Sequence, residues 1–411
     1  MRKRLAIFLT GLSLAVLAGS RIQAADEPKP AEPPPTTVDA SKGGFTIKSG
    51  DNVVTFGTFG QFRAIVDDRE DFDADPAGSL GFGREDGPST SFDIPRFRMW
   101  VRGTMWKPWI KYLLSWEFSR TAGESDSKIL DAYVEFSSKS ILAARIGQYK
   151  VPFSLQELTG DQYQMFTERA IDNALSPARD EGVTVGGVTN SKKLGYAVGV
   201  FNGNGQSRRQ DDKNVLYAAR VWVDPLGEYK LTEGTSENPE HNILHFGLGY
   251  RGGEAGRIPD FMVPATQTGI IFEDADDQKA YNVEFAWKWH RLFATAEYFG
   301  QTSENENPPP ATADVDAAAY HAQFGVGVGE HLEFGARYAE VDSNTDVDND
   351  KLKETRAVGT YYIKGHNAKV MLEIGQLAYE ALAPGRGTRL ASAAGQEVKD
   401  KSARLQVQLL F

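Results

Sequence analysis

Segments of about ten residues, in which apolar and polar residues alternate, recur from residue 54 to residue 411. This alternation places apolar side chains on one face of a β-strand and polar side chains on the other. The pattern occurs sixteen times, at residues 54–67, 93–106, 109–120, 128–138, 141–150, 181–190, 194–203, 214–224, 242–251, 278–289, 291–301, 319–329, 331–342, 354–364, 367–378 and 402–411. A closed bacterial barrel has an even number of antiparallel strands. We therefore predict an all-β fold, a 16-stranded antiparallel transmembrane β-barrel.

The segment at residues 402–411 shows the two faces most clearly. Its apolar residues are expected to face lipid and its polar residues the lumen: Leu405, Val407, Leu409 and Phe411 outside, and Arg404, Gln406 and Gln408 inside. Two other segments follow the same rule, with Leu194, Tyr196, Val198 and Val200, and then Tyr281, Val283, Phe285, Trp287 and Trp289, on the lipid face, and with Asn282, Glu284, Lys288 and His290 in the lumen. A last strand ending on Phe is usual in outer-membrane barrels, and we expect Phe411 to be part of the insertion signal.

The connections between the segments alternate in length. Short ones are expected at residues 107–108, 139–140, 191–193, 289–290, 329–330 and 365–366, and long polar ones at 67–92, 302–318 and 342–353. Short turns on one side and long loops on the other are typical of outer-membrane barrels, in which the short turns are periplasmic. The alternative is a soluble barrel of amphipathic strands, which gives no reason for this asymmetry.

The N-terminal part of the chain is expected to lie outside the barrel. Residues 1–24 have a basic start, an apolar stretch and a cleavage site after Ala24, which together predict a secretory signal peptide. Residues 25–44 are rich in Pro and predict an extended periplasmic lead-in. The barrel then covers residues 45–411, and the outer membrane of a Gram-negative bacterium is the expected location.

Composition excludes several other classes of protein. The formal net charge of −11 falls by four, to −15, when residues 1–24 are removed, and so acidic a chain lacks the basic surface that nucleic acid requires. There is no cysteine, and the mean hydropathy of −0.41 excludes a helical membrane protein. The six His are scattered, and the acidic stretch at 67–75 lacks the Gly and distal Glu of an EF-hand. We predict no catalytic site, metal site or cofactor.

One stretch carries a more specific signal. Residues 144–159 read ARIGQYKVPFSLQELT, residues 166–170 read FTERA and residues 173–187 read NALSPARDEGVTVGG, with DAYVEF just before them at 131–136. Together they resemble the phosphate-selective porin O and P family, most strongly over residues 93–203. The resemblance implies a homotrimeric, sixteen-stranded outer-membrane channel for anions such as phosphate or polyphosphate.

The connection at residues 150–180 is too long and too apolar for an exposed loop. Its apolar residues include Val151, Phe153 and Leu175, and loops of this length are more often functional than idle. We expect it to fold inward as a constriction loop that brings Lys150, Arg169 and Arg179 into the lumen. Packing of the loop on the barrel rim is the alternative.

An anion-selective pore needs Arg and Lys at its constriction, where a low-dielectric wall strengthens their field. Outward-facing Phe97 and Met99 would place Arg96, Arg98 and Arg102 together on the lumen face as a ladder of guanidinium groups. Further cations are expected on inward positions: Arg63, Lys111, Arg145, Arg220, Arg251, Arg337 and Lys369. Acidic residues share that face, so that the same cations could serve to brace the wall: Glu117, Asp131, Glu135, Glu284, Glu297, Glu333 and Glu373.

Three functions are therefore compatible with the sequence. The leading hypothesis is passive diffusion of small anions, with phosphate or polyphosphate preferred, through a barrel surrounded by outer-membrane lipid. The first alternative is a general or cation-tolerant porin on the same scaffold. The second is a plugged structural or adhesive surface barrel.

Overall fold

The computed structural model describes residues 35–39, 44–69, 87–119, 128–207, 214–254, 277–304, 315–380 and 397–411. The predicted signal peptide lies outside the described residues, as does most of the predicted lead-in. None of the helices in the described ranges has the length and apolar character needed to span a bilayer.

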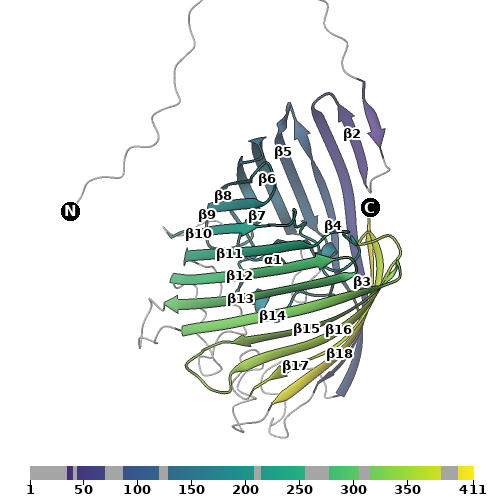
Figure 1. Ribbon diagram of the computed structural model, residues 1–411, viewed down its shortest axis with the longest axis vertical. Coiled ribbons are helices and arrows are strands. Elements are labelled where there is room, and N and C mark those ends of the chain that lie inside the picture. The colour runs from purple at the N-terminus through teal and green to yellow at the C-terminus, as the bar shows by residue number, and fades with distance from the viewer. Residues whose placement is uncertain are drawn as a thin grey trace, which may run out of the picture. The chain divides into compact units, whose positions relative to one another are not determined.

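The strands form one closed antiparallel ring (Figure 1). Sixteen strands make up the ring: β3 (Asn52–Arg69), β4 (Gly87–Met105), β5 (Lys107–Glu117), β6 (Lys128–Lys139), β7 (Leu142–Lys150), β8 (Arg179–Val188), β9 (Leu194–Phe201), β10 (Leu216–Val223), β11 (Ile243–Glu254), β12 (Asp277–Trp289), β13 (Leu292–Glu304), β14 (Val315–Val328), β15 (Leu332–Asp342), β16 (Lys351–Tyr362), β17 (Ala368–Tyr379) and β18 (Val398–Leu410). Each pairs with the next along the chain, and β18 closes the ring on β3, from Asp400 opposite Arg69 to Leu410 opposite Phe59. The predicted sixteen-stranded barrel is confirmed.

Two short strands extend the sheet at the N-terminal end of β3. β1 (Thr37–Asp39) pairs with β2 (Phe45–Ser49), and β2 pairs with residues 52–56 of β3. The chain therefore makes regular structure within the segment that we expected to be only a flexible lead-in. The physical reason is that β18 ends beside Phe59 while β3 begins at Asn52, so β3 has unpaired backbone groups that β2 can use.

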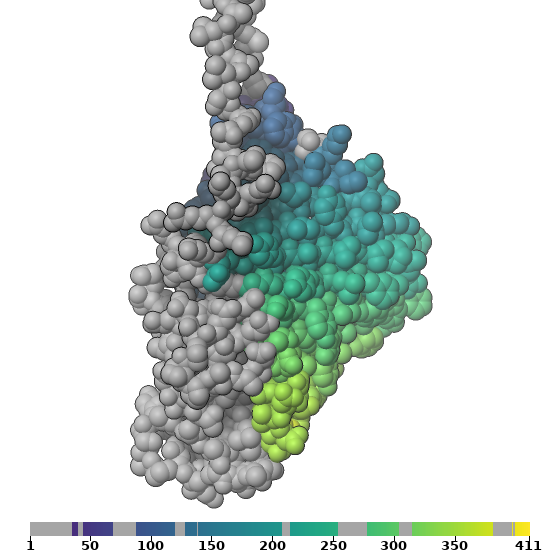
Figure 2. Space-filling view, turned by 90° about the vertical axis from the view of Figure 1, so that its left-hand side faces the viewer, coloured from purple at the N-terminus to yellow at the C-terminus, as the bar shows by residue number. Residues whose placement is uncertain are grey.

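The two faces of the strands have the predicted polarity. In β9, Val198 is 56% exposed, and in β12 Tyr281 is 51% exposed, whereas the alternating residues Asn282, Glu284 and Lys288 are 1% exposed and face inward. His290 does not follow the prediction, because it occupies the turn after β12 with a φ of 47°. The outer surface in Figure 2 changes from teal through green to yellow-green, as expected for strands that pair in chain order.

The six turns predicted to be short are short. The turn predicted at residues 107–108 is made by Trp106, with a φ of 60°, and Lys107 already belongs to β5. The connection of residues 224–242 between β10 and β11, for which no length was predicted, lies at the same end of the barrel as the short turns but is much longer.

A charge on the lipid face tests the assignment of the two faces. Leu372, in the middle of β17 and far round the ring from β9 and β10, is 57% exposed on the outer face. Leu372→Arg is expected to lower the free energy of unfolding by about 2–4 kcal/mol, because the guanidinium would lie in hydrocarbon. Urea titration of the barrel folded in phospholipid vesicles measures this change. Leu372→Ile is the matched control and should stay near wild type. Equal stability of Leu372→Arg and wild type would place residue 372 away from lipid.

Candidate pore and its constriction loop

Residues 151–178, between β7 and β8, form a compact loop on the inner side of the strands (Figure 1). The loop contains one helical turn, α1 (Leu155–Leu158), and two 3-10 turns, η1 (Asp161–Tyr163) and η2 (Ile171–Leu175). The Ser154 hydroxyl caps α1 by accepting a hydrogen bond from Glu157 N at 3.1 Å. Phe153 and Leu175 are fully buried against Phe299 and other side chains of the barrel wall. Burial of these apolar residues accounts for the inward position of the loop.

Carboxylates on the inner wall hold the backbone of this loop. Glu297 of β13 accepts hydrogen bonds from Leu155 N at 3.0 Å and from Gln156 N at 2.6 Å. Glu373 of β17 accepts one from Thr167 N at 2.8 Å. Backbone N–H groups that leave water need such acceptors, so these contacts fix the path of the loop across the lumen.

Residues 224–242 form a second inward segment, which the sequence analysis missed. The Glu233 carboxylate accepts a hydrogen bond from Met165 N at 2.8 Å, and Glu233 N donates to Tyr163 O at 2.8 Å. Glu333 on the wall accepts from the Thr235 hydroxyl at 2.7 Å. The segment therefore links the constriction loop to the wall from the end with the short turns. Its unusual length at that end is the one sequence signal that indicated it.

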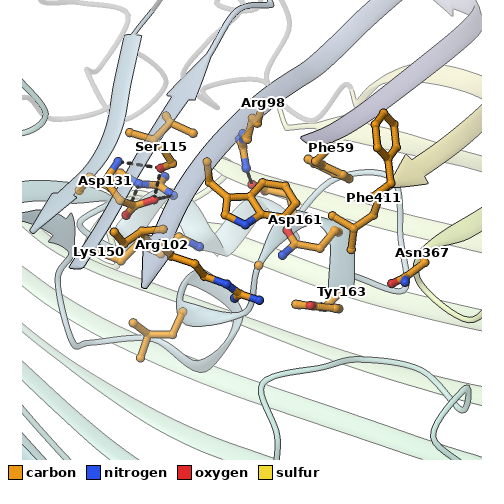
Figure 3. A pocket seen from close by; sticks show the side chains of 18 residues that line it. Phe59, Arg98, Arg102, Ser115, Asp131, Lys150, Asp161, Tyr163, Asn367 and Phe411 are labelled. Carbon is orange, nitrogen blue, oxygen red and sulfur yellow. Dashed lines mark hydrogen bonds and ion pairs between the residues drawn. The ribbon is translucent and has the colours of Figure 1, made fainter. Parts of the chain in front are cut away.

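Two residues of the proposed ladder, Arg96 and Arg98, bind carboxylates. Arg96 pairs with Glu168 at 2.5 Å and with Asp161 at 3.4 Å, and both of these acids belong to the constriction loop. Arg98 pairs with Glu117 on β5 at 2.6 Å and also with Asp161. Figure 3 shows the Arg98 side chain reaching from the wall toward Asp161. The positive charge of both guanidinium groups is thus compensated.

Arg102, the third residue of the ladder, differs from the other two. Its side chain is exposed, and among the residues that the structure describes it has neither an ion pair nor a hydrogen bond. It lies on β4 opposite Thr55 of β3 and Leu113 of β5. Arg102 is therefore the member of the ladder whose charge stays available to a solute.

Four of the seven further predicted cations divide into three groups. Arg63 binds Glu168 at 2.8 Å and lies near Arg96. Arg145 and Lys111 share Glu135, at 2.6 and 3.5 Å. Arg220 is buried against Glu284 at 2.6 Å on a different part of the wall, so it does not join the ladder.

Three cations were predicted to reach the lumen with the constriction loop, and only one of them is a loop residue. Arg169 lies within the loop and binds Asp161 at 2.5 Å. Lys150 and Arg179 are the last residue of β7 and the first of β8, where Arg179 binds Asp131 at 3.0 Å. The loop carboxylates Asp161 and Glu168 were not singled out from the sequence. Together they bind four of the predicted cations, namely Arg63, Arg96, Arg98 and Arg169.

The electrostatics of the loop acids follow from these contacts. Burial alone would raise the pKa of Glu168, but the charges of Arg96 and Arg63 outweigh it and lower the pKa to about 2. Burial likewise opposes ionisation of Asp161, yet Arg169, Arg98 and Arg96 hold its pKa well below the usual range. Both acids are therefore charged at neutral pH.

Two cavities lie between the loop and the wall, and a third is lined by residues of the wall alone. The first, of about 320 Å³, is bordered by Arg98, Arg102, Lys150 and Arg179 (Figure 3). The second, of about 240 Å³, lies toward the long-loop end and includes Arg179 and Arg251. The third, of about 390 Å³, lies toward the short-turn end and includes Arg102, Lys111 and Arg145. Arg179 borders the first and second cavities, and Arg102 borders the first and third. Each of the three cavities is therefore lined by at least two cationic side chains.

A closed barrel with an apolar outer face, a polar inner face and an inward loop defines an outer-membrane channel. The comparison with protein families agrees with this class. Residues 70–409 match the family described as Phosphate-selective porin O and P, and the chain belongs to that family. No curated protein matches the chain.

Solved structures share the fold at low sequence identity. The anion-selective porin from Comamonas acidovorans has a TM-score of 0.58 at 14% identity, with 88% of this chain and 100% of that chain covered. OmpT of Vibrio cholerae, solved in trimer form, has a TM-score of 0.54 at 15% identity, with 87% and 99% covered. The outer membrane channel DcaP of Acinetobacter baumannii has a TM-score of 0.53 at 10% identity, with 87% and 97% covered.

The low pKa of Glu168 leads to a pH-dependent prediction. Glu168→Gln is expected to raise the anion-over-cation permeability ratio at pH 7 by about twofold, because Arg63 and Arg96 lose their shared negative partner. A group with a depressed pKa stays charged below the usual pKa of about 4.3 and loses its charge only as the pH falls through its own value. The difference between variant and wild type should therefore persist at pH 4 and close toward pH 2.

Reversal potentials in planar bilayers measure this difference. Glu228→Gln, which removes an exposed carboxylate paired with Lys192, is the matched control and should not change the ratio. If the difference already disappears between pH 5 and pH 4, Glu168 is not held by the two guanidinium groups.

Proposed function

We propose that the protein is an outer-membrane channel for passive diffusion of small anions, with phosphate or polyphosphate preferred. The observation that carries the proposal is a set of three cavities with cations on their linings, in which Arg179 borders the first and second and Arg102 borders the first and third. Membership of the phosphate-selective porin O and P family supports the phosphate preference. The Comamonas acidovorans porin with the same fold is anion-selective, which supports the sign of the selectivity.

The physical basis of this selectivity is the uneven pairing of charges along the cavities. Arg98 and Arg179 are each paired with a carboxylate of the wall. They therefore stabilise the wall and contribute less to the positive field in the lumen than an unpaired arginine would. Arg102 adds a positive charge that no described side chain compensates, at the junction of two cavities. A cation moving along this path meets a repulsive site there, whereas an anion meets an attractive one.

We also propose that three copies of the chain assemble. β9 and β10 have 8 residues each, whereas a tilted transmembrane strand needs about 9–11 residues to cross the hydrocarbon. A short wall of this kind is better covered by a neighbouring barrel than by lipid. OmpT of Vibrio cholerae, which has the same fold, forms a trimer.

Reversal of the charge at Arg102 tests the proposed selectivity. Arg102→Glu is expected to lower the anion-over-cation permeability ratio by about fivefold or more, because it replaces the uncompensated positive charge by a negative one. The triple variant with Glu at positions 96, 98 and 102 should prefer cations. Reversal potentials of the full chain under a salt gradient in planar bilayers give the ratio, and phosphate block of chloride current gives the preference.

Lys192→Glu is the matched control for Arg102→Glu. It makes the same charge change at an exposed turn residue paired with Glu228, away from the three cavities, and should leave the ratio unchanged. Equal permeability to potassium and chloride in the wild type would favour a general porin. A folded trimer that does not conduct would favour a plugged surface barrel.

A further inference from the structure

The first cavity contains aromatic side chains that an inorganic anion does not require. Trp100 lies on β4 between Arg98 and Arg102, two residues from each, so all three point to the same side of the strand. Their neighbours Phe97 and Met99 are 41% and 44% exposed on the outer face. Trp100 therefore lines the lumen directly between two cations of the ladder.

The local sequence holds the Trp100 indole flat against the wall. Gly57 of β3 is the residue opposite Trp100, and a Cβ at Gly57 would lie 2.0 Å from Cζ2 of the indole. The ring thus occupies the place that a side chain at residue 57 would take. On the other side of Trp100 lies Ser115 of β5, which is also small. Two small neighbours leave a broad aromatic surface on the wall.

Apolar groups border this cavity from the wall and from the constriction loop. Phe59, the next inward residue of β3, is buried, and the Arg98 guanidinium lies 5.9 Å from the centre of its ring. The loop supplies Leu158 and Tyr163 to the same cavity. Figure 3 shows Phe59 and Tyr163 lining the cavity together with Arg98 and Arg102.

Three of the four cations that border the same cavity already have a carboxylate partner. Arg98 binds Glu117 and Asp161, Arg179 binds Asp131, and Lys150 lies 3.5 Å from Glu157. Among the described residues, this leaves Arg102 as the one cation of the four without a carboxylate partner. A single guanidinium suits a carboxylate, which it binds with two parallel hydrogen bonds.

We propose that this cavity also binds anions that carry a planar aromatic ring, with the ring against Trp100 and the carboxylate on Arg102. The inference rests on the proposed anion channel and adds aromatic carboxylates to its inorganic solutes. Offset stacking on an indole stabilises such a ring beyond the effect of its burial. The volume is sufficient, because an apolar cavity of about 150 Å³ already holds benzene and this cavity has a volume of about 320 Å³.

Block of chloride current through the full chain in planar bilayers tests the proposal. The probes are benzoate, cyclohexanecarboxylate, acetate and inorganic phosphate, each added to the same salt solution. Benzoate is expected to reach half-block at about 3- to 10-fold lower concentration than acetate, and below cyclohexanecarboxylate, because its ring is flat and aromatic. Trp100→Leu should remove the difference between benzoate and acetate, and Trp100→Phe should keep most of it.

Trp222→Leu is the matched control. Trp222 also lies opposite a glycine, Gly195, and near an arginine, Arg220, but it does not line any of the three cavities. This variant should keep both the benzoate preference and the wild-type permeability ratio of chloride to potassium.

The outcomes separate the two proposals. A wild-type channel without anion preference contradicts the proposed function. A channel that prefers anions but is blocked equally by benzoate and acetate contradicts the aromatic site alone. A benzoate preference that survives Trp100→Leu also contradicts it, and makes Trp100 a packing residue of the wall.

Discussion

The hydrogen bonds from the constriction loop to carboxylates of the wall are the contacts on which the pore depends. Glu297 and Glu373 of the wall accept two hydrogen bonds and one, respectively, from backbone N–H groups of the loop, and Glu233 of the inward segment 224–242 accepts one more. A buried N–H without an acceptor and a buried carboxylate without a donor are both costly. Each partner removes the cost of the other, so the loop has one low-energy path across the lumen. The shape of every cavity beside it follows from that path.

These contacts also reconcile the acidic composition of the chain with the proposed anion selectivity. The inward acids either receive loop hydrogen bonds, as Glu297 does, or pair with cations, as Glu284 pairs with Arg220 and Asp131 with Arg179. Their charge is therefore compensated by these contacts, and it contributes little to the field along the proposed solute path. Net charge describes the whole chain, whereas selectivity depends on which charges remain unpaired along that path.

The strands could be predicted because the alternation of apolar and polar residues is set within each strand by its own neighbouring residues. Each of the sixteen segments overlaps one strand of the ring, and the apolar residues Val151, Phe153 and Leu175 correctly indicated an inward loop. The ion pairs could not be predicted in this way, because they join residues that are far apart in the sequence. Arg96 meets Glu168 across 72 positions, and which acid it meets depends on the path of the loop. Residues 224–242 are mostly polar and show no alternation of apolar and polar residues. Their length indicated an unusual connection, but their contacts with the constriction loop could not be predicted from it.

The loop also decides where along β4 the selective charge lies. Asp161 binds Arg98 and lies near Arg96, and Glu168 binds Arg96. The constriction loop, to which both acids belong, therefore compensates the charges of Arg96 and Arg98. The uncompensated charge is thereby displaced to Arg102, nearer the short-turn end and beside Trp100. In the proposed channel, narrowing and selection therefore lie at different levels of one strand. A solute that comes from the long-loop end passes Arg96 and Arg98, whose charges are compensated, before it meets the uncompensated guanidinium of Arg102, so the field that it meets grows more positive along the path.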